Sequence, residues 1–474
     1  MVPRKSCYNW WLWQGLDYFS SCLTIPFLHL LSLCLSCYYQ TTFDRQQLRV
    51  LFLRYAVGGP ILLMMTIMIS PLAFIGYVIW VALCSFCVQQ PFIYVDSDEH
   101  HSSVVTRKCP SAFTICSSNV ILIPEILVRY NNNRNVYWRA QEIPTRFMRH
   151  QTPSLNVMRN LREPVKREDI VQSWLPDIDV IMLQEVFERL RGRQLYNKFS
   201  KKYPYCLYNA GQHSLKTNLC LMGSGLFIAS RFPIMEASFH PFSYSTKYAK
   251  FVGYGVLLAK LYLGMKSTKD ESMKAVGYVG NTHTQAYQGK DRVIVHQMEE
   301  ARSWLNEFVK ETHNPQEEVL MFVVFGGDIN SDNMSPGDSA VQNLSLWEEY
   351  EDPCRESAGH DKPWTVGTEH RQKLLHHPFM QYPETFRDIL LDDVQRRYFL
   401  LDADVEEQTP DLMKCVPKPD SNGIVGATEC GGRRRVDCLT LRRDSKVSPT
   451  SMWFSSSLAG LTDHVPVAFM LEEV

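Results

Sequence analysis

The sequence has almost no net charge, because its 49 Lys and Arg residues are balanced by 50 Asp and Glu residues. Without a broad cationic surface, bulk binding to the phosphates of a nucleic acid is not expected. The 14 cysteines are scattered at irregular spacing along the chain. A chain of 474 residues is long enough for one large domain or two to three small ones, so it needs no disulfide scaffold. Most cysteines are therefore expected to be small core residues.

Two stretches lack charged residues altogether. Residues 18–39 and 56–88 contain no Asp, Glu, Lys or Arg. A helix of about 20 apolar residues crosses a hydrocarbon core, so each stretch is predicted to contact a membrane. A cleaved signal peptide is not expected, because the second stretch is too long and no clear small-residue cleavage site follows. A buried helical hairpin in a soluble core is the alternative.

Positive charge gives these stretches no orientation. Basic residues stand before, between and after them: Arg4, Lys5, Arg45, Arg49, Arg54, Arg107 and Lys108. The positive-inside rule therefore does not choose between spanning helices and re-entrant or interfacial segments. In the re-entrant case, Pro26, Pro60 and Pro71 would help to break the helices. Four cysteines near the segment ends are candidates for reversible acylation: Cys34, Cys37, Cys84 and Cys87.

From about residue 111 the composition becomes that of a soluble α/β domain. We predict three parts: a membrane-associated region over residues 1–90, a linker over 91–110 and a folded domain over 111–474. Strands are predicted at 113–124, 179–183, 225–229, 252–262, 275–282, 319–325, 436–441 and 465–471. Residues 130–148 are predicted to be partly helical, 152–168 to be a loop, and 352–411 to be mixed and loop-rich. An amphipathic helix is predicted from the spacing of Ile294, Met298, Ala301, Leu305 and Phe308.

The most informative stretch is residues 323–330. An apolar, β-branched run predicts a buried strand, which Gly326 and Gly327 are expected to end. Asp328 and Asn330 follow one residue apart. Glycines let a substrate approach the backbone closely, so this strand end can present a carboxylate and an amide to a ligand. An ordinary turn is the alternative, because Gly, Asp and Asn are common turn residues.

Several predicted strands, this one included, have at one end a polar residue able to bind a metal or a phosphate. The set is Asn119, Glu185, His283, Asp328, Asn330, Asp437, Asp463 and His464. Each residue alone is explained by a turn, a cap or a satisfied polar group. Together, hard oxygen ligands and two histidines predict a magnesium-assisted phosphoester site.

Four short motifs resemble, in order, those of the endonuclease/exonuclease/phosphatase superfamily. They are Leu183-Gln184-Glu185-Val186, Gly327-Asp328-Ile329-Asn330, Arg435-Val436-Asp437 and Thr462-Asp463-His464, and residues 224–234 resemble a fifth. The resemblance covers roughly residues 111–474. It implies an α/β fold, a deoxyribonuclease-I-like four-layer αββα sandwich, here preceded by two hydrophobic membrane segments.

Within that superfamily the chain resembles the neutral sphingomyelinases. The resemblance rests on the motif after His283, on residues 352–355 and 362–368, on the Pro124-Glu125-Ile126-Leu127 motif that follows Asn119, and on the two hydrophobic segments. No large low-complexity insertion separates Asn119 from Glu185, so the chain is more similar to the shorter, mitochondria-associated branch. This implies a membrane location at the mitochondrion or endoplasmic reticulum, with the Golgi or plasma membrane as the alternative.

The resemblance also implies roles for the site residues. Glu185 would hold Mg²⁺, with Mn²⁺ as a substitute, and Asn119 and Asp463 would lie close by. His464 would take a proton from water, with its imidazole oriented by Asp437. The remaining expected roles are positioning of that water (Asp328), donation to a non-bridging oxygen (Asn330), and stabilisation or protonation of the leaving alkoxide (His283). Asn330 and His283 would thus both contact the substrate phosphate.

One position departs from the subfamily pattern. Its members have an Asp followed five residues later by Lys-Gly, but here Ala249 and Tyr254 occupy those two positions before Gly255. A gating contact between the Asp and the Lys is therefore not expected in this chain.

The sequence thus predicts hydrolysis of sphingomyelin to ceramide and phosphocholine, with membrane sphingomyelin as substrate, anionic phospholipids as candidate activators and no nucleic acid partner. A nuclease or inositol-phosphate phosphatase on the same fold is the second hypothesis. The balanced charge and the absence of a Pro-Ala-Trp-Cys-Asp-Arg motif speak against it. A catalytically inactive membrane scaffold is the third hypothesis, and the complete residue set speaks against it. The sequence makes no prediction about oligomeric state.

Overall fold

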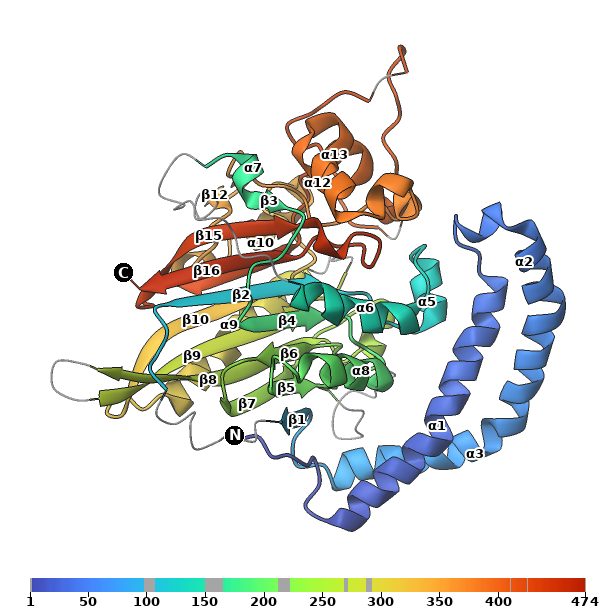
Figure 1. The fold of residues 1–474 in the computed structure, drawn as a ribbon, viewed down its shortest axis with the longest axis horizontal. Coiled ribbons are helices and arrows are strands. Elements are labelled where there is room, and N and C mark those ends of the chain that lie inside the picture. The colour runs from blue at the N-terminus through green and yellow to red at the C-terminus, as the bar shows by residue number, and fades with distance from the viewer. Residues whose placement is uncertain are drawn as a thin grey trace.

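Two β-sheets pack face to face, and helices cover their outer faces (Figure 1). The computed structural model describes residues 2–97, 107–149, 165–211, 222–267, 272–286, 292–409, 411–423 and 425–473. One apolar cluster lies between the sheets, and two more lie between each sheet and its helices. Three buried interfaces separate four layers, so the predicted αββα sandwich is confirmed.

The first sheet has eight strands and is covered by α6 (Val136–Met148) and α8 (Arg189–Phe199). Its order is β1 (Ile93–Asp96), β5 (Tyr205–Tyr208), β6 (Phe227–Ser230), β4 (Val180–Gln184), β2 (Ala112–Asn119), β16 (Val467–Glu473), β15 (Val447–Ser455) and β3 (Val171–Gln172). Strand β1 lies inside the predicted linker, so the sheet begins earlier in the chain than the composition indicated. β2 and β4 run parallel, with Asn119 opposite Gln184, and therefore end at one edge.

The second sheet has six strands and is covered by α9 (Val293–Thr312). Its order is β11 (Tyr350–Glu351), β14 (Asp437–Arg442), β10 (Glu318–Asp328), β9 (Ser272–His283), β8 (Gly255–Ser267) and β7 (Ile234–Pro241). All five residues that predicted the amphipathic helix are buried in α9. Asp328 lies opposite His283 on one side and Asp437 on the other, so pairing alone brings these three residues together.

The predicted end of strand β10 was wrong, because the strand continues through both glycines to Asp328. Gly327 has a φ of 142°, and a Cβ atom there would lie 1.9 Å from the carbonyl oxygen of Thr282. Glycine at this position therefore lets strands β9 and β10 approach closely, so that their pairing continues as far as Asp328 at the site.

The stretch 352–411 contains helices that the sequence did not predict, α12 (Pro383–Leu391) and α13 (Asp393–Phe399). Most of the predicted loop 152–168 lies outside the described residues. The remaining short elements are α2 (Leu48–Leu53), α5 (Glu125–Tyr130), α7 (Arg167–Ile170), α10 (Ser339–Gln342), α11 (Leu346–Glu349), β12 (Arg355–Ser357) and β13 (His360–Asp361).

The two uncharged stretches form a helical hairpin of α1 (Trp11–Tyr38) and α3 (Gly59–Phe86) beside the sandwich (Figure 1). Both helices are long and apolar enough to cross a membrane. The prediction that proline breaks them was wrong: Pro26 and Pro71 lie inside continuous helices, and Pro60 lies in the first turn of α3. A neighbouring helix can satisfy the backbone groups that proline leaves free, and the first turn needs no donor there.

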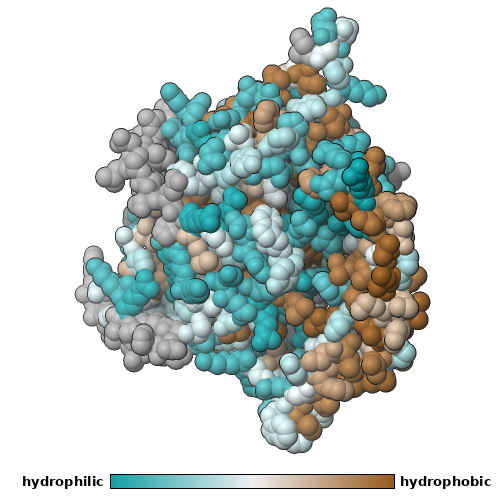
Figure 2. All heavy atoms as spheres, turned by 45° about the vertical axis from the view of Figure 1, so that its right-hand side comes forward, coloured by the Kyte–Doolittle hydropathy of each residue, from teal (hydrophilic) through white to brown (hydrophobic). Residues whose placement is uncertain are grey.

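Small and polar side chains fill the contact between α1 and α3. Ser20 and Thr24 of α1 are buried, and Ser20 donates a hydrogen bond of 2.7 Å to the carbonyl of Gly76 in α3. A Cβ atom at Gly76 would lie 2.7 Å from Cβ of Leu23, so the helices are closely packed. Large apolar side chains face outward, as Figure 2 shows along one side of the molecule.

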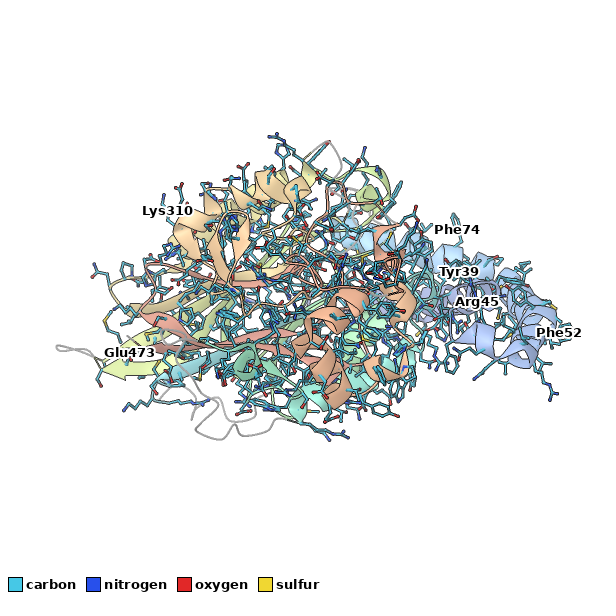
Figure 3. The ribbon with its side chains drawn as sticks, turned by 90° about the horizontal axis from the view of Figure 1, so that it is seen from above. Tyr39, Arg45, Phe52, Phe74, Lys310 and Glu473 are labelled. Atoms are coloured by element: carbon cyan, nitrogen blue, oxygen red, sulfur yellow. The ribbon has the colours of Figure 1, made fainter. Side chains whose placement is uncertain are left out.

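The hairpin is attached to the sandwich at both ends. At the tip, Asp44 forms ion pairs with Arg129 of α5 and with Arg54. Near the start of α1, Asp17 forms an ion pair with Arg189 of α8. Figure 3 shows the hairpin, with Arg45 and Phe52 near its tip, at the end of the molecule opposite Lys310 and Glu473.

This packing affects the predicted acylation sites. Cys34, Cys37 and Cys84 are buried, and only Cys87 of the four is partly exposed. An acyl chain on any of the three buried thiols would require the hairpin to open. Cys22, which the sequence did not single out, is exposed on α1.

Candidate active site

Asp328 lies at the centre of a group of polar side chains from both sheets. Its Oδ2 accepts a 2.8 Å hydrogen bond from Asn119 Nδ2. The same oxygen lies 3.6 Å from Nε2 of His283 and 3.8 Å from Nε2 of His464. The side chain of Asp328 is almost completely buried, so these contacts form away from bulk water.

Glu185 and Asp463 form the acidic part of this group. Burial and, next, the charge of Asp463 raise the pKa of Glu185 to about 8. Oδ1 of Asp463 is buried and has no hydrogen-bond partner among the described residues. Buried, uncompensated carboxyl oxygens are costly unless a cation binds them, and hard oxygens are the ligands of Mg²⁺ and Ca²⁺. The residues present therefore fit a divalent cation.

The predicted ligand Asn119 bridges this acidic part to Asp328. Its Nδ2 also donates to Oε1 of Glu185 at 3.1 Å, and its Oδ1 accepts from the backbone N–H of Ile121 at 3.0 Å. Asn119 thus orients the two carboxylates in this arrangement. To offer its own oxygen to a cation, its amide would have to rotate.

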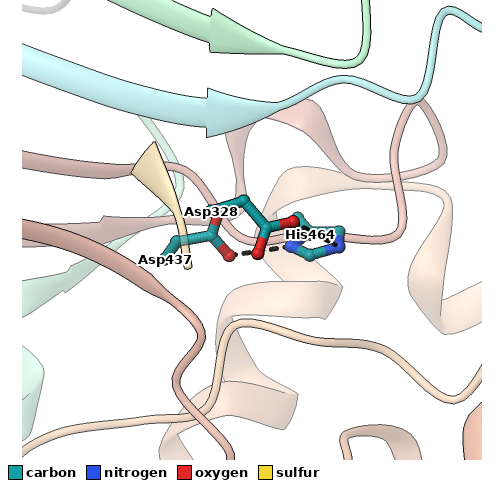
Figure 4. Close-up of side chains that lie close together, drawn as sticks. All are labelled: Asp328, Asp437 and His464. Carbon is teal, nitrogen blue, oxygen red and sulfur yellow. Dashed lines mark hydrogen bonds and ion pairs between the residues drawn. The ribbon is translucent and has the colours of Figure 1, made fainter. Parts of the chain in front are cut away.

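His464 and Asp437 form a hydrogen-bonded pair, with 2.8 Å between Nδ1 and Oδ2 (Figure 4). Burial alone would lower the pKa of His464, but Asp437 and Asp328 raise it well above its usual value. The pair leaves Nε2 facing the centre of the site. Asp328, Asp437 and His464 could together also ligate a metal, but the short Asp437–His464 contact is itself explained by a hydrogen bond.

His283 lies on the other side of Asp328. Burial lowers its pKa to about 4, so its imidazole is neutral at pH 7. A neutral imidazole can donate a hydrogen bond but carries no charge to a leaving group. The ring of Tyr254 packs edge-on against His283, with 5.0 Å between ring centroids. Tyr254, at the position where the subfamily pattern predicts a lysine, therefore contributes an aromatic ring to this site.

Three residues beside the site have left-handed backbone conformations that non-glycine residues rarely adopt: Ile121, Glu185 and Asn330, with φ of 43°, 62° and 46°. Strain of this kind persists where the surrounding structure enforces it, commonly at functional sites. The turn at Asn330 directs Nδ2 to the carbonyl of Thr284 at 2.9 Å. In this position the amide of Asn330 stabilises the segment that directly follows strand β9.

Two threonines at the site were not predicted. Thr368 Oγ1 accepts hydrogen bonds from the backbone N–H groups of Val436 and Asp437. Thr462 Oγ1 donates to the carbonyl of Asn119 at 2.7 Å. Each joins a loop to a site residue that is distant in sequence. Their motifs were visible in the sequence, but a threonine in a loop has no signal that distinguishes this role from an ordinary turn.

Seven of the eight predicted site residues thus lie in one cluster. Asn330 joins it through its backbone N–H, which donates to Oδ1 of Asp328, while its amide faces Thr284. The cluster combines a place for a divalent cation, a histidine with a carboxylate partner and a neutral histidine. That set suits metal-assisted hydrolysis of a phosphoester.

The chain is similar to known phosphodiesterases over most of its length. It is 26% identical to sphingomyelin phosphodiesterase 5 of Danio rerio, over 93% of this chain and 92% of that protein. It is 30% identical to sphingomyelin phosphodiesterase 3 of Mus musculus, over 64% of this chain and 46% of that protein. The difference in coverage agrees with the predicted similarity to a shorter branch.

No family model matches the chain. Among solved structures, that of beta toxin from Staphylococcus aureus aligns with 75% of this chain and 99% of its own, with a TM-score of 0.41 and 16% identity. The sequence similarity to these phosphodiesterases, together with the ordered motifs and the cluster they form, supports a neutral sphingomyelinase.

Proposed function

We propose that this chain hydrolyses sphingomyelin to ceramide and phosphocholine at a membrane surface, with Mg²⁺ as its cation. The observation that carries the proposal is the meeting of the Glu185–Asp463 group and the His464–Asp437 pair at Asp328. When bound, a divalent cation polarises the phosphoryl oxygens and neutralises the charge that develops on them.

The side chains divide the proton transfers between them. A water molecule attacks phosphorus while Nε2 of His464 takes its proton, and Asp437 stabilises the imidazolium that forms. Asp328 lies 3.8 Å from Nε2 and can orient that water. The bond from phosphorus to the ceramide oxygen breaks, with His283 donating a hydrogen bond to the departing oxygen. The oxygen of water ends in phosphocholine, the departing ceramide alkoxide takes a proton from solvent water, and His464 returns its proton to solvent.

The hairpin supports the membrane part of the proposal. Its outward side chains are large and apolar, including Phe52, Ile67 and Phe74, whereas its interior is small and polar. Helix pairs in lipid pack through small residues, since lipid gives apolar side chains no reason to face inward. The ion pairs at both of its ends keep this apolar surface at a fixed place beside the catalytic domain.

The direct test is hydrolysis of choline-labelled sphingomyelin in mixed micelles by the purified full chain, with Mg²⁺ and with a chelator, and with duplex DNA as a parallel substrate. We expect phosphocholine release that stops with chelator and returns when Mg²⁺ is restored. Release of nucleotides with no sphingomyelin turnover would replace the proposal with a nuclease on the same fold.

A further inference from the structure

Arg139 is a buried cation beside the active site that the reaction scheme does not use. It lies on α6, and its side chain points into the sandwich, with a relative exposure of 1%. Among the residues that the structure describes, no carboxylate lies within ion-pair distance of its guanidinium. A fully buried arginine normally has such a partner, so its position calls for another explanation.

The guanidinium donates only to backbone carbonyls, and these belong to two loops. Nη2 donates to Val120 at 2.7 Å, and both terminal nitrogens donate to Ile121 at 3.1 and 3.2 Å. Nε donates to the carbonyl of Leu461 at 2.5 Å. The first loop directly follows Asn119, and the second directly precedes Asp463. One side chain therefore joins the loops that carry two predicted site residues.

The contact with Ile121 has a direct consequence for Asn119. Ile121 has a φ of 43°, which is strained for a β-branched residue. Its carbonyl accepts the two bonds from Arg139, and its N–H donates to Oδ1 of Asn119. The strained turn thus fixes the amide that bridges Glu185 and Asp328. The planar fork of arginine can hold several carbonyls at once, which a lysine cannot.

We propose that Arg139 is a positioning residue: it clamps the loops after Asn119 and before Asp463 and so sets the spacing of the cation site. This rests on the proposed function, because it assigns the cation to Glu185 and Asp463, with Asn119 orienting the carboxylate of Glu185. Arg139 also brings a positive charge near this acidic group. Burial lowers its pKa to about 10, so it remains charged at neutral pH.

The test replaces Arg139 with Lys, which keeps the charge but not the fork, and compares it with Arg146→Lys. Arg146 lies on the same helix, is partly exposed and pairs with Glu142. For each full-length protein we would measure the Mg²⁺ concentration for half-maximal activity, the maximal rate at saturating Mg²⁺ and the shift in melting temperature that Mg²⁺ causes without substrate. Changes to groups that orient metal ligands typically cost about 10- to 100-fold in affinity.

We expect Arg139→Lys to need about tenfold more Mg²⁺, to show a smaller Mg²⁺-induced shift, and to recover most of its maximal rate at saturation. Arg146→Lys should change none of these. A lower melting temperature of Arg139→Lys with an unchanged Mg²⁺ response would mean a merely structural role and would overturn the proposal.

A second variant keeps the proposal testable if Arg139→Lys does not fold. Thr462→Val removes the other hydrogen bond between the same two loops, and we expect a smaller change of the same kind. An unchanged Mg²⁺ response in Thr462→Val would then count against the clamp.

The melting-temperature measurement needs no substrate, so it separates failure of the clamp from failure to hydrolyse sphingomyelin. A wild-type chain that Mg²⁺ does not stabilise would contradict the assignment of Arg139.

Discussion

The hairpin and the sandwich bury opposite kinds of side chain. In the sandwich, β-branched and aromatic residues such as Val324 and Phe322 fill the space between the sheets. In the hairpin, Ser20, Thr24 and Gly76 lie inside, and large apolar residues face out. The first arrangement is typical of a domain that folds in water, and the second is typical of helices that pack in lipid. The site lies in the sandwich, and the hairpin is the candidate membrane part.

The largest effect is expected from Glu185→Ala in the sandwich. Losing the carboxylate removes a ligand of the cation, and charge stabilisation of several kcal/mol corresponds to about 10³-fold or more in rate. We expect Mg²⁺-dependent turnover to fall below detection while circular dichroism and melting remain those of a folded domain. Glu188→Ala is the control, since Glu188 is partly exposed and pairs with Arg191. Near-normal turnover of Glu185→Ala at limiting Mg²⁺ would contradict the assignment.

Replacing the base should cost less than replacing the cation ligand. For His464→Gln and Asp437→Asn we expect a loss of about 10²–10⁴-fold in kcat with an unchanged Mg²⁺ requirement. Because the carboxylates raise the pKa of His464, the wild-type rate should fall as pH decreases and the imidazole becomes protonated. The control His360→Gln changes an exposed residue. Full recovery of His464→Gln at high Mg²⁺ would instead make His464 a metal ligand.

Deleting residues 1–88 should separate the two parts. The deletion keeps Phe92 and β1, which belong to the core and the sheet. We expect a folded protein that retains turnover on detergent micelles but binds and hydrolyses bilayers less well, because the apolar hairpin surface is gone. Flotation with lipid vesicles measures the binding. Equal flotation of the full and truncated chains would contradict the anchoring role.

The smallest effect is expected where the two parts meet. Asp44→Asn weakens the ion pairs with Arg129 and Arg54, at a cost of about 1–3 kcal/mol for charged hydrogen bonds. Burial alone would raise the pKa of Asp44, but hydrogen bonds from Thr41 and the charge of Arg129 lower it below its usual value. Docking of the tip should therefore be stable above the unfolded pKa of about 4 and be lost as pH falls below it.

Hydrogen exchange of residues 41–47 and 125–130 measures that docking. In Asp44→Asn these segments should exchange faster at neutral pH, and the wild type should approach the variant only in acid. Asp411→Asn, at an exposed position, is the control. Exchange that is equal in all three proteins would mean that the tip is held by other contacts.

The sequence predicted residues at strand ends better than residues whose partners lie on a second helix or on distant loops. Asp328 and Glu185 could be predicted because each stands at the end of an apolar strand, and His464 because it stands just before one. The break expected at Pro26 for a re-entrant segment does not occur, because a neighbouring helix can satisfy the backbone groups that proline leaves free. Arg139 was missed because a charged residue on an amphipathic helix is normally solvated, and only the three-dimensional course of two distant loops gives it partners.

The central claim is that water activated at His464 attacks phosphorus. Turnover of sphingomyelin in water enriched in oxygen-18, followed by mass spectrometry of all products, tests it most directly. We predict one heavy oxygen in phosphocholine and none in ceramide, with the same pattern at a reduced rate in His464→Gln. Heavy oxygen in ceramide, or free choline beside ceramide phosphate, would contradict attack at phosphorus with departure of the ceramide oxygen.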